Sequence, residues 1–579
     1  MKTVLRQLGR YRRDTWLCIA MTTLEVVMEI LLPFITALII DQGLEAASLP
    51  TVYRYGILMV IMSFCSLAFG ALGGKYAASA SSGLAANLRE AVYNNIQTFS
   101  FSNIDKFSVP GLVTRMTTDI TNVQNAYMML IRVAVRAPLM LIFSYIMCLI
   151  ISPKLSLTFL LAVIFLAIVL GVIMVVTMRI FNDVFSKYDD LNASVQENIS
   201  AIRVVKAFVR EDHENEKFDK ASNNLYSLFV KAEGLLAFNN PAMMLAIYFC
   251  IIMVSWLGAH FIVGGSMSAG ELTSLFSYVM SLMMSLMMLS MVVVMITMSM
   301  ASIRRISEVL DETPDLAEPE QPVYTVADGS VDFDHVDFSY KHGSGKNALS
   351  DIDLHIRAGE TIGVIGGTGS GKSSLVNLIC RLYDTDKGTV KVGGVDVRNY
   401  DMETLRNQVS VVLQKNTLFS GTILDNLRWG NPDATEDECK AACQAACADE
   451  FIDRFPDGYN TRIERGGANV SGGQKQRLCI ARALLKKPKV LILDDSTSAV
   501  DTATDAKIRA AFAKEIPGTT KIIIAQRISS VENADRILVL DNGRINGFDT
   551  HENLLKTNAI YREIYESQVK GGGDFDQPA

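Results

Sequence analysis

The stretch TIGVIGGTGSGKSS at residues 361–374 is the most informative part of the sequence. It consists of a short apolar segment, a glycine-rich loop at 366–373 and the beginning of the helical pattern SLVNLICRL. In a loop of the form G-x-x-x-x-G-K-S, glycines let successive backbone N–H groups converge on phosphate oxygens, and the helix N-terminus adds positive potential. The stretch therefore predicts a strand, a phosphate-binding loop and a helix within an α/β domain.

Two kinds of side chain complete the predicted phosphate site. Lys372 is expected to reach the terminal phosphates of a nucleotide, and Ser373 is expected to ligate Mg²⁺. Downstream, KVLILDDSTSAVD predicts a buried strand that ends at Asp494 and Asp495. The Asp494 carboxylate can hold the water shell of the metal opposite Ser373. The loop residues expected to contact the nucleotide are Gly366, Thr368, Gly369, Ser370, Gly371, Lys372, Ser373 and Ser374.

The composition of the rest of the chain indicates a membrane protein. Of 579 residues, 50% are apolar and only 20% are charged, and the mean hydropathy is +0.25. A purely soluble enzyme is excluded on this ground. The net charge of −7 leaves no dominant basic surface, so nucleic acid is excluded as a main partner. Nine scattered cysteines lack the density of a secreted disulfide scaffold, so we expect free thiols.

Six apolar runs are each long enough to cross a bilayer as a helix. The first run is too long for a cleaved signal peptide and has no small-residue cleavage site at its end. The short connections 41–55, 151–155 and 264–271 contain only Arg54 and Lys154 as basic residues, so the N-terminus and everything after the last run are expected in the cytoplasm. The predicted spans are about 16–40, 56–74, 128–150, 156–178, 241–263 and 272–300.

The longer connections, 75–127 and 179–240, are polar but keep a helical periodicity. We therefore expect the membrane helices to continue into the cytoplasm. The predicted organisation is a six-helix transmembrane domain at 1–304, a proline-containing linker at 305–329, a nucleotide-binding domain at 330–567 and a disordered tail at 568–579.

A third motif places the sequence in a family. In NVSGGQKQRLCIARALL, Ser471, Gly472, Gly473 and Gln474 open a helix with bare N–H groups, between the phosphate loop and Asp494. With this order and spacing the whole chain resembles an exporter-type half-transporter of the ABC transporter superfamily. The resemblance implies a membrane all-α bundle with cytoplasmic extensions, fused to an α/β P-loop ATPase domain with a helical subdomain, and it implies ATP and Mg²⁺ as ligands.

The resemblance also implies roles for further residues. Tyr340 stands where the family stacks an aromatic ring on adenine, and Gln414 stands where a glutamine touches Mg²⁺ and the membrane-domain interface. TRIERGG at 461–467 resembles the segment that senses the coupling helices, which we expect at 102–110 and 199–208. Residues 498–501, ending at Asp501, resemble the loop that crosses the interface between two ATPase domains. Val470 replaces the usual leucine before the signature.

Two departures from the family pattern fall in one site. Asp495 stands where the family has its hydrolytic glutamate, and Gln526 stands where it has a switch histidine. Aspartate is one methylene shorter, which would displace the carboxylate that polarises the attacking water, and a positioned general base is worth roughly 10²- to 10⁴-fold. Glutamine can hydrogen-bond a γ-phosphate but cannot carry positive charge. Together these residues resemble the degenerate site of heterodimeric bacterial multidrug ABC exporters.

From this resemblance we expect one half of a heterodimeric ATP-driven exporter in a bacterial cytoplasmic membrane. A second, non-identical half-transporter would supply the glutamate and the histidine, and this chain would supply its intact signature to that partner's site. The expected cargo is an amphiphilic, drug-like small molecule. Two alternatives stay open: a lipid or peptide exporter of the same architecture, and a regulatory subunit that holds ATP without turning it over.

Three further patterns allow two interpretations each. Cys439, Cys443 and Cys447 share one helix face, which fits either packing or a metal or redox site. The last span is rich in methionine, which fits either cavity lining or packing; its methionines include Met280, Met283, Met284, Met287, Met288, Met291, Met295 and Met298.

Charged residues inside two of the predicted spans are the third such pattern. Glu25 and Glu29 share a face of the first span, and Arg132 and Arg136 share a face of the third. Counting ~1.5 Å per residue from the outer ends places Glu25 and Arg136 at the same depth. They therefore form either a structural ion pair or, through the carboxylates, a contact with a cationic substrate.

Overall fold

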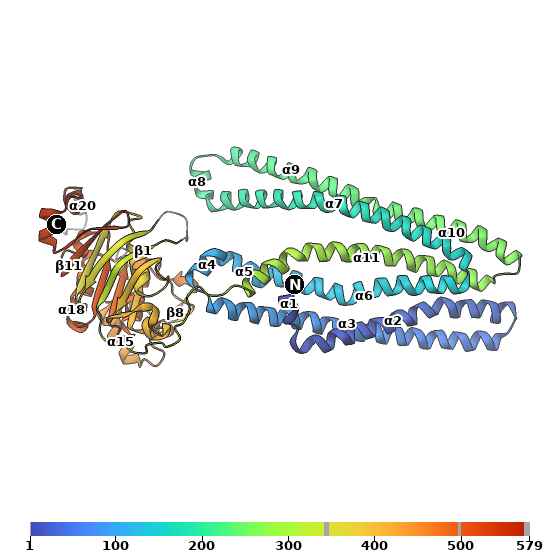
Figure 1. Cartoon of the computed structure of the whole chain (residues 1–579), viewed down its shortest axis with the longest axis horizontal. Coiled ribbons are helices and arrows are strands. Elements are labelled where there is room, and N and C mark those ends of the chain that lie inside the picture. The colour runs from blue at the N-terminus through green and yellow to red at the C-terminus, as the bar shows by residue number, and fades with distance from the viewer. Residues whose placement is uncertain (1, 341–346, 496–499, 572–579) are drawn as a thin grey trace. The chain divides into compact units, whose positions relative to one another are not determined.

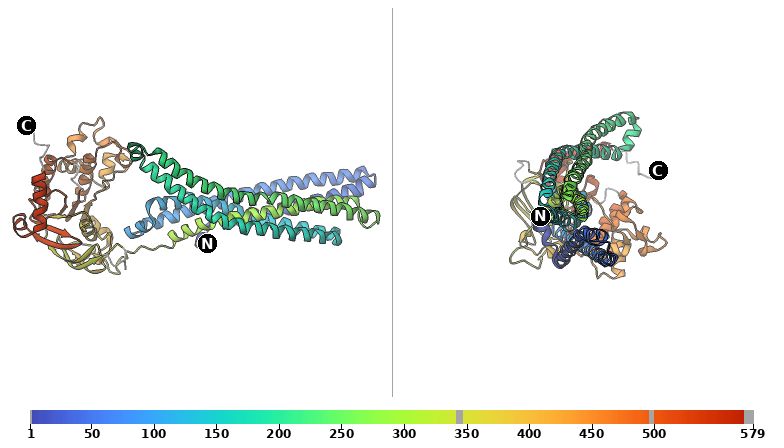
Figure 2. Two further views of the ribbon diagram at one scale, coloured as in Figure 1. Left: turned by 90° about the horizontal axis from the view of Figure 1, so that it is seen from above. Right: turned by 90° about the vertical axis from the view of Figure 1, so that its right-hand side faces the viewer.

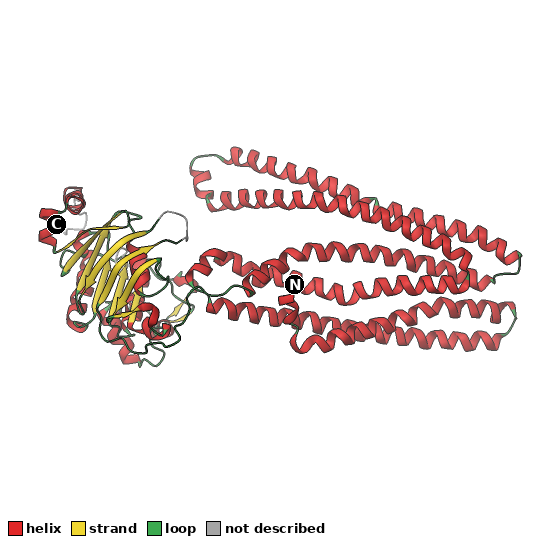
Figure 3. Ribbon diagram, in the orientation of Figure 1, coloured by secondary structure: helices red, strands yellow, loops and turns green. Residues whose placement is uncertain are grey.

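The computed structural model describes residues 2–340, 347–495 and 500–571. The chain divides into two compact units, a membrane unit of Met1–Thr98 with Phe107–Glu312 and an ATPase unit of Phe99–Lys106 with Thr313–Ala579. The first is built of helices, and the second contains all described strands (Figures 1 and 3).

Six helices of the membrane unit are long and apolar enough to cross a bilayer, which confirms the number of predicted spans. The 50-residue helix α3 is about 75 Å long, well beyond the ~30 Å of a hydrocarbon core. The polar connections are therefore helical continuations of the spans, as predicted. The long helices are α2 (Arg12–Leu38), α3 (Leu49–Thr98), α6 (Ile120–Ile151), α7 (Pro153–Ser200), α9 (Glu211–Ala237), α10 (Asn239–Val263) and α11 (Ala269–Leu310).

Short helices and turns connect these elements. The first connection is itself mostly helical, because α2 continues as a π-helix through Ile39–Glu45. The ends of the next two connections are fixed by side-chain caps: Ser152 caps α7, which has a proline in its first turn, and Ser268 forms a capping box with Glu271 at the start of α11. The short helices are α1 (Lys2–Arg6), α4 (Phe101–Phe107), α5 (Val109–Thr114) and α8 (Ile202–Ala207).

The membrane helices pack in two groups that share a core. Helix α2 packs on α3 and α6, and α11 packs along α6. Helices α7 and α9 run side by side, and α10 packs on α7 and α11 (Figures 1 and 2). Phe159 and Tyr278 are fully buried in the core between these groups, and the Tyr278 hydroxyl donates to the Ile30 carbonyl at 2.8 Å.

The ATPase unit contains a six-stranded sheet in the order β12-β11-β3-β10-β9-β6 and a four-stranded antiparallel sheet in the order β2-β1-β4-β5. Strands β11, β3, β10, β9 and β6 are parallel, so their carboxyl ends meet at one edge. The strands are β1 (Val331–Phe338), β2 (Leu349–Ile356), β3 (Thr361–Gly366), β4 (Lys387–Val392), β5 (Val395–Asp396), β6 (Val409–Val412), β7 (Gly421–Thr422), β8 (Arg462–Ile463), β9 (Val490–Asp494), β10 (Thr520–Ile524), β11 (Arg536–Asp541) and β12 (Arg544–Asp549).

Helices cover these sheets and form the expected helical subdomain. Helix α12 (Lys372–Ile379) follows the phosphate loop, and α18 (Thr502–Glu515) precedes β10. The remaining helices are α13 (Met402–Gln408), α14 (Ile423–Leu427), α15 (Glu436–Ala445), α16 (Asp449–Ile452), α17 (Gly472–Leu484), α19 (His551–Thr557) and α20 (Ala559–Gly571). Helix α20 includes the first residues of the stretch 568–579 for which we expected a disordered tail, so the predicted start of that tail at 568 is too early; residues 572–579 lie outside the described part of the chain.

The three clustered cysteines are packing residues. Cys439, Cys443 and Cys447 are all buried in one apolar cluster of the helical subdomain. Burial raises the pKa of the Cys443 thiol to about 12, so this thiol is not a reactive thiolate near neutral pH. The packing interpretation is therefore the one that the structure favours.

Candidate nucleotide site

The predicted site residues gather at the carboxyl edge of the parallel sheet. Asp494, the last residue of β9, is paired in register with Ile524 of the neighbouring strand β10. Strand β3 lies on the other side of β10 and ends at Gly366, where the phosphate loop begins. Gln414 follows the end of β6, the next strand beyond β9, and its side chain is exposed. The sheet thus brings the loop, the aspartates and Gln414 to one edge.

The phosphate loop is shaped by its glycines. Gly371 has a φ of 99°, which favours glycine, and a Cβ atom there would lie 2.8 Å from the Ala348 carbonyl oxygen. The Lys372 ammonium donates to the carbonyls of Gly366 at 2.9 Å and Gly367 at 2.7 Å, so its charge lies inside the loop. Burial lowers the pKa of Lys372, while the charges of Asp494 and Asp495 raise it.

Asp494 is held as a buried carboxylate, 6% exposed. Burial raises its pKa, and the negative charge of Asp495 adds to this rise, whereas a hydrogen bond from Ser373 and the charge of Lys372 oppose it. The oxygens of Ser373, Asp494 and Gln414 are the kind of ligand that Mg²⁺ prefers. Ser370 Oγ is buried without a hydrogen-bond partner among the described residues, which fits a phosphate contact. These residues therefore suit Mg²⁺ and a nucleotide phosphate.

The two residues that depart from the family pattern are in direct contact. The Gln526 side-chain amide donates to Asp495 Oδ2 at 2.8 Å. Asp495 has a φ of 47°, and its backbone N–H donates to the Ile524 carbonyl at 3.0 Å. The backbone thus holds the Asp495 side chain at the end of β10. There Gln526, at the position of the switch histidine, donates a hydrogen bond to it from a neutral amide.

Gln568 of α20 was not anticipated from the sequence, because it falls where the tail was predicted. Its amide nitrogen donates to the Gln526 carbonyl at 2.8 Å, and its amide oxygen accepts from the Ile528 N–H at 2.9 Å. The segment that carries Gln526 is therefore tied to the C-terminal helix by two hydrogen bonds. The helical pattern of 559–567 continues past 567, and it was the only sequence signal for this contact.

Tyr340 lies beside the phosphate loop at half exposure. Its hydroxyl shares a hydrogen bond with Ser374 Oγ at 2.9 Å, and its ring packs edge-on against Tyr383 at a centroid distance of 5.2 Å. Tyr383 in turn donates to Asp105 at 2.8 Å and packs near Phe101, both on α4. The sequence did not single out Tyr383, because it carries no motif.

The signature residues lie in the helical subdomain. Ser471 caps α17, accepting from the Gln474 N–H at 3.3 Å, while the Gln474 side chain accepts from the Ser471 N–H at 2.8 Å. Gly472 and Gly473 lie in the first turn of the helix and carry no side chain of their own. The structure therefore forms the predicted helix start, and places it on a different element from the phosphate loop.

Two interface segments are partly described. Asp501 caps α18 by accepting from the Thr504 N–H at 2.9 Å, and this bond lowers the pKa of Asp501. The preceding residues 496–499, which include the first half of the predicted interface loop at 498–501, lie outside the described residues. The 461–467 segment contains β8 and is braced by the Asn469 side chain, which donates to the Arg462 carbonyl at 2.8 Å.

The charged residues of the spans form an ion pair. Arg136 contacts Glu25 through one nitrogen and Glu29 through the other, at 2.7 Å for the latter. Arg132 has no carboxylate partner among the residues that the structure describes. An arginine that bridges two carboxylates offsets part of their charge where water is scarce, while Glu25 Oε2 is buried without a hydrogen-bond partner among the described residues. Of the two interpretations left open, the arrangement favours the structural ion pair.

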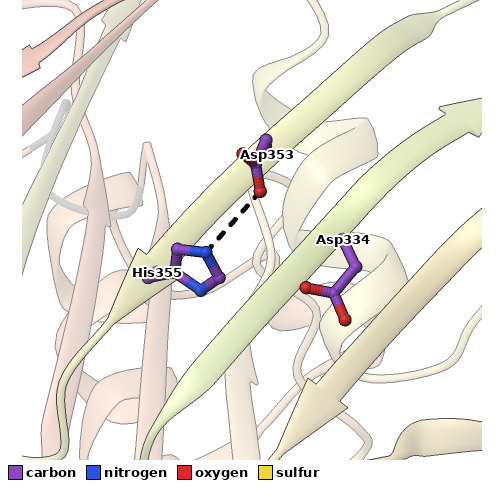
Figure 4. Close-up of side chains that lie close together, drawn as sticks. All are labelled: Asp334, Asp353 and His355. Atoms are coloured by element: carbon purple, nitrogen blue, oxygen red, sulfur yellow. Dashed lines mark ion pairs between the residues drawn. The ribbon is translucent and has the colours of Figure 1, made fainter.

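A group of surface side chains on β1 and β2 has metal-ligand chemistry. Asp334, Asp353 and His355 bring their ligand atoms within 4.8 Å of one another (Figure 4). However, Asp334 is already bonded to Lys391 at 2.6 Å, and His355 to Asp332 at 2.8 Å. These contacts explain the group as surface ion pairing.

Comparison with known proteins gives consistent matches. The family described as "ABC transporter transmembrane region" matches residues 15–307, and the one described as "ABC transporter" matches residues 349–498. An uncharacterized ABC transporter ATP-binding protein of Bacillus subtilis is 36% identical over 568 residues, 98% of each chain. An ATP-dependent lipid A-core flippase of Desulfotalea psychrophila is 32% identical over 488 residues, 83% of this chain and 84% of the flippase.

A solved structure of a bacterial Atm1-family ABC exporter with ATP bound matches 96% of this chain and 99% of its own, with a TM-score of 0.83 and 26% identity. The fold is thus that of an Atm1-family exporter, with six apolar helices and one α/β ATPase domain. An ABC ATPase domain binds ATP, normally with Mg²⁺, and couples its hydrolysis to transport. The chain belongs to the ABC transporter family, as a multi-pass membrane half-transporter of exporter architecture.

Proposed function

We propose that this chain is one half of a heterodimeric ATP-driven exporter, and that the ATP held by its own phosphate loop is hydrolysed poorly. The observation that carries the proposal is the hydrogen bond between Gln526 and Asp495 at 2.8 Å. A carboxylate that accepts from a neutral amide is occupied on one oxygen, and that amide brings no positive charge to stabilise the transferred phosphoryl group.

Side-chain length supports the same assignment. The backbone of Asp495 is tied to β10 through Ile524, so the side chain cannot move outward to replace the missing methylene without breaking that bond. A general base must come within about 2.6–3.2 Å of the water that it activates. In this proposal Lys372, Ser373 and Asp494 bind Mg·ATP, and Asp495 polarises its water weakly.

The signature supports a partner that is not identical. In the family, each ATP lies between one chain's phosphate loop and the other chain's signature, and here Ser471 and Gln474 form a complete cap. A homodimer would therefore combine two good signatures with two weak phosphate-loop sites. A partner with glutamate and histidine at the corresponding positions would restore one competent site.

An uncovered apolar turn also supports a partner chain. Around α8, the side chains of Phe208 and Val209 are 74% and 80% exposed, and Ile199 and Val204 are exposed as well. This segment lies beyond the spans, where water and not lipid surrounds the protein. Such a patch is costly unless another protein surface covers it. We assign it to contact with the ATPase domain of the partner, which would carry domain closure to the helices.

For the cargo we propose an amphiphilic compound taken from the cytoplasm or the inner leaflet of the bacterial cytoplasmic membrane. ATP binding would close the two ATPase domains and turn the bundle from inward- to outward-facing. A lipid cargo is the second candidate, and the likeness to a lipid A-core flippase favours it. Arg136 already contacts both Glu25 and Glu29, which argues against a cationic cargo at that position.

Steady-state ATPase activity of the purified chain tests the proposal. The wild type alone should bind ATP and turn it over slowly, and the double variant Asp495→Glu with Gln526→His should raise the rate by at least about tenfold, because a positioned base is worth ~10²- to 10⁴-fold. Asp495→Asn is the matched control and should change little. Brisk, cooperative hydrolysis by the wild-type homodimer would contradict the asymmetric assignment.

A measurement of nucleotide exchange distinguishes an exporter half from a regulatory subunit. In the assembled pair, nucleotide trapped at this chain's site should exchange during each transport cycle if the chain is an exporter half. Nucleotide that stays bound through many cycles would identify a regulatory subunit instead.

A further inference from the structure

The ATPase unit contains a half-open pocket of about 320 Å³ between α18, β10 and the segment that leads to β11. Thr361 and Lys521, which pair in register at the starts of the parallel strands β3 and β10, lie in its wall. The nucleotide site gathers at the carboxyl ends of these strands. The pocket is therefore distinct from the nucleotide site.

Lys521 is a buried cation of this wall. It is 5% exposed, and its ammonium donates to the Thr519 carbonyl at 2.9 Å. Within the described chain no carboxylate lies at ion-pair distance from it. Burial lowers the pKa of Lys521, and the charge of Asp535, which accepts from the Thr361 N–H at 2.8 Å, raises it. An ammonium removed from water is stabilised by an anion beside it, so Lys521 suits a carboxylate that enters the pocket.

Arg509, on α18, adds a hydrogen-bond donor to the wall. One terminal nitrogen of its guanidinium lies 3.1 Å from an Asp505 oxygen, and the other donates to the Ser529 carbonyl at 3.0 Å. Its Nε is buried and has no hydrogen-bond partner among the residues that the structure describes. Buried polar groups are nearly always hydrogen-bonded, so this N–H indicates an acceptor that comes from outside the described fold.

The rest of the wall is mostly apolar. Ala506, Ala510 and Ala513 follow one another at i, i+4 and i+7 on α18 and line the pocket together with Phe512 and Ile523. An apolar side chain that fills the space beside these small alanines would remove apolar surface from water. The pocket thus fits an apolar side chain with anions on either side.

The chain contains such a group directly after α20. Residues 572–579 read GGDFDQPA, so that Phe575 stands between Asp574 and Asp576. These residues lie outside the described part of the chain. Two acidic side chains around one aromatic ring match the two basic side chains and the apolar part of the pocket. Charge complementarity therefore favours this segment as the occupant.

The end of α20 is close enough for this segment to reach the pocket. The Gln568 side chain accepts from the Ile528 N–H at 2.9 Å, and the carbonyl of the next residue, Ser529, accepts from Arg509. Phe575 lies seven residues after Gln568, of which three belong to α20 and four follow it. Three helical residues cover ~4.5 Å, and four extended residues cover up to ~14 Å. The segment can therefore reach the pocket from the observed end of α20.

We propose that the segment DFD after α20 binds in the pocket of its own ATPase unit, with the Phe575 ring against the alanines of α18 and the two flanking carboxylates bonded to Lys521 and to Nε of Arg509. Binding would hold α20 in place, and with it the Gln568 side chain that is bonded to the segment carrying Gln526. The contact needs neither a partner chain nor slow hydrolysis, so it is independent of the proposed function.

Photo-cross-linking of the full chain in lipid nanodiscs tests the contact. Phe575 is replaced by benzoylphenylalanine, which keeps an aromatic ring at this position, and the cross-linked peptides are identified by mass spectrometry. We expect most of the product to join the C-terminal peptide to residues 506–513 and 521–534. Product spread evenly over the surface of the ATPase unit would overturn the proposal.

Charge variants locate the contact. Asp574→Asn with Asp576→Asn should lower the yield of this product by about tenfold, because two charge-assisted hydrogen bonds are weakened. These substitutions change no residue of the pocket, so a misfolded wall cannot explain the loss. Lys521→Met should give a similar loss, and Lys514→Met, at an exposed lysine of α18 outside the wall, is the matched control without effect. Equal yields from the wild type and the double variant would overturn the proposal.

Isotope labelling distinguishes binding within one chain from binding to a second copy. In a mixture of light and heavy chains, we expect the cross-links to join segments of the same chain. Cross-links between light and heavy chains would assign the segment to the pocket of a neighbouring copy and overturn the intramolecular contact.

Hydrogen exchange measures the effect on the nucleotide edge. The backbone amides of 526–530 should exchange faster in the Asp574→Asn, Asp576→Asn double variant than in the wild type, because α20 is held less firmly, while the amides of β9 should exchange equally in both. Unchanged exchange at 526–530 would overturn the link from the pocket to Gln526.

Discussion

Each unit contains a pair of neighbouring carboxylates, and the two pairs differ in the side chains that contact them. In the membrane unit, Glu25 and Glu29 are bridged by one arginine, Arg136, which donates to both. In the ATPase unit, Asp494 is buried with a raised pKa, and Asp495 accepts from the neutral amide of Gln526. The first pair shares one directly bonded arginine within the chain, whereas Asp494 forms no ion pair with a basic side chain among the described residues. A directly bonded basic side chain, more than residue type, distinguishes the carboxylates of the membrane unit from Asp494.

The largest expected effect is on the glutamate pair that shares Arg136. Arg136→Met leaves two carboxylates without a counter-ion in the bundle and should destabilise the protein by about 3–5 kcal/mol. Thermal unfolding in detergent measures this, and Arg132→Met serves as the matched control with little change. Addition of Glu25→Gln and Glu29→Gln should restore stability to Arg136→Met. Equal stability of the two arginine variants would show that the ion pair is not structural.

The next effect concerns the signature. Gly472→Asp places negative charge where the partner's γ-phosphate is expected, so ATPase activity of the assembled pair should fall by roughly 10²-fold or more. By contrast, Asp495→Asn should lower this ATPase activity by far less than the ~10²-fold loss expected when a positioned base is removed. If the two variants lose activity equally, Asp495 is a working base and the comparison drawn above fails for the ATPase unit.

A smaller effect is expected at Tyr340. Stacking of a base on an aromatic ring contributes about 1–3 kcal/mol, so Tyr340→Ala should weaken ATP binding at this site by that amount. Tyr340→Phe loses only the hydrogen bond to Ser374 and should retain most of the affinity. Titration with a fluorescent ATP analogue measures both. Unchanged affinity in Tyr340→Ala would mean that another residue stacks on adenine.

The smallest effect is a pH-dependent gain in stability. Because the folded-state pKa of Asp494 is raised, its ionised form destabilises the nucleotide-free protein above that pKa. Asp494→Asn should therefore raise the Tm in the absence of Mg²⁺ and nucleotide at neutral pH. The difference from the wild type should shrink as the pH falls through the raised pKa, where Asp494 becomes protonated. A constant difference across this range would assign the gain to another cause.

The parts of the molecule that the sequence predicted are those encoded locally. The phosphate loop, the strand before Asp494 and the helix cap at Ser471 follow from short motifs, and the six spans follow from apolar length. The sequence placed Gln526 and Asp495 in one site, but it could not predict their hydrogen bond, because that bond depends on the pairing of β9 with β10. Counting residues from the outer ends matched Arg136 with Glu25 in depth, but it could not predict the contact, because the rotation of α6 against α2 decides which arginine faces the glutamates.

Contacts between distant segments were missed for the same reason. Tyr383 joins Tyr340 to Asp105 on α4, across a long separation in the chain, and neither neighbour of Tyr383 in sequence indicates this. One pocket of the membrane unit is lined by residues from four helices, α7, α9, α10 and α11, so the two polar atoms in its wall that lack a partner among the described residues, on Thr177 and Asn239, appear only after packing. Such features depend on long-range geometry, which no local pattern encodes.

The two hydrogen bonds of Gln568 have a practical consequence for protein production. A chain truncated after residue 567, where the domain was predicted to end, would lack the residue that holds Gln526 and Ile528. An affinity tag or fluorescent fusion placed close behind α20 would pull on the same segment. Expression vectors for kinetic work should therefore carry their tags at the N-terminus and keep all of α20.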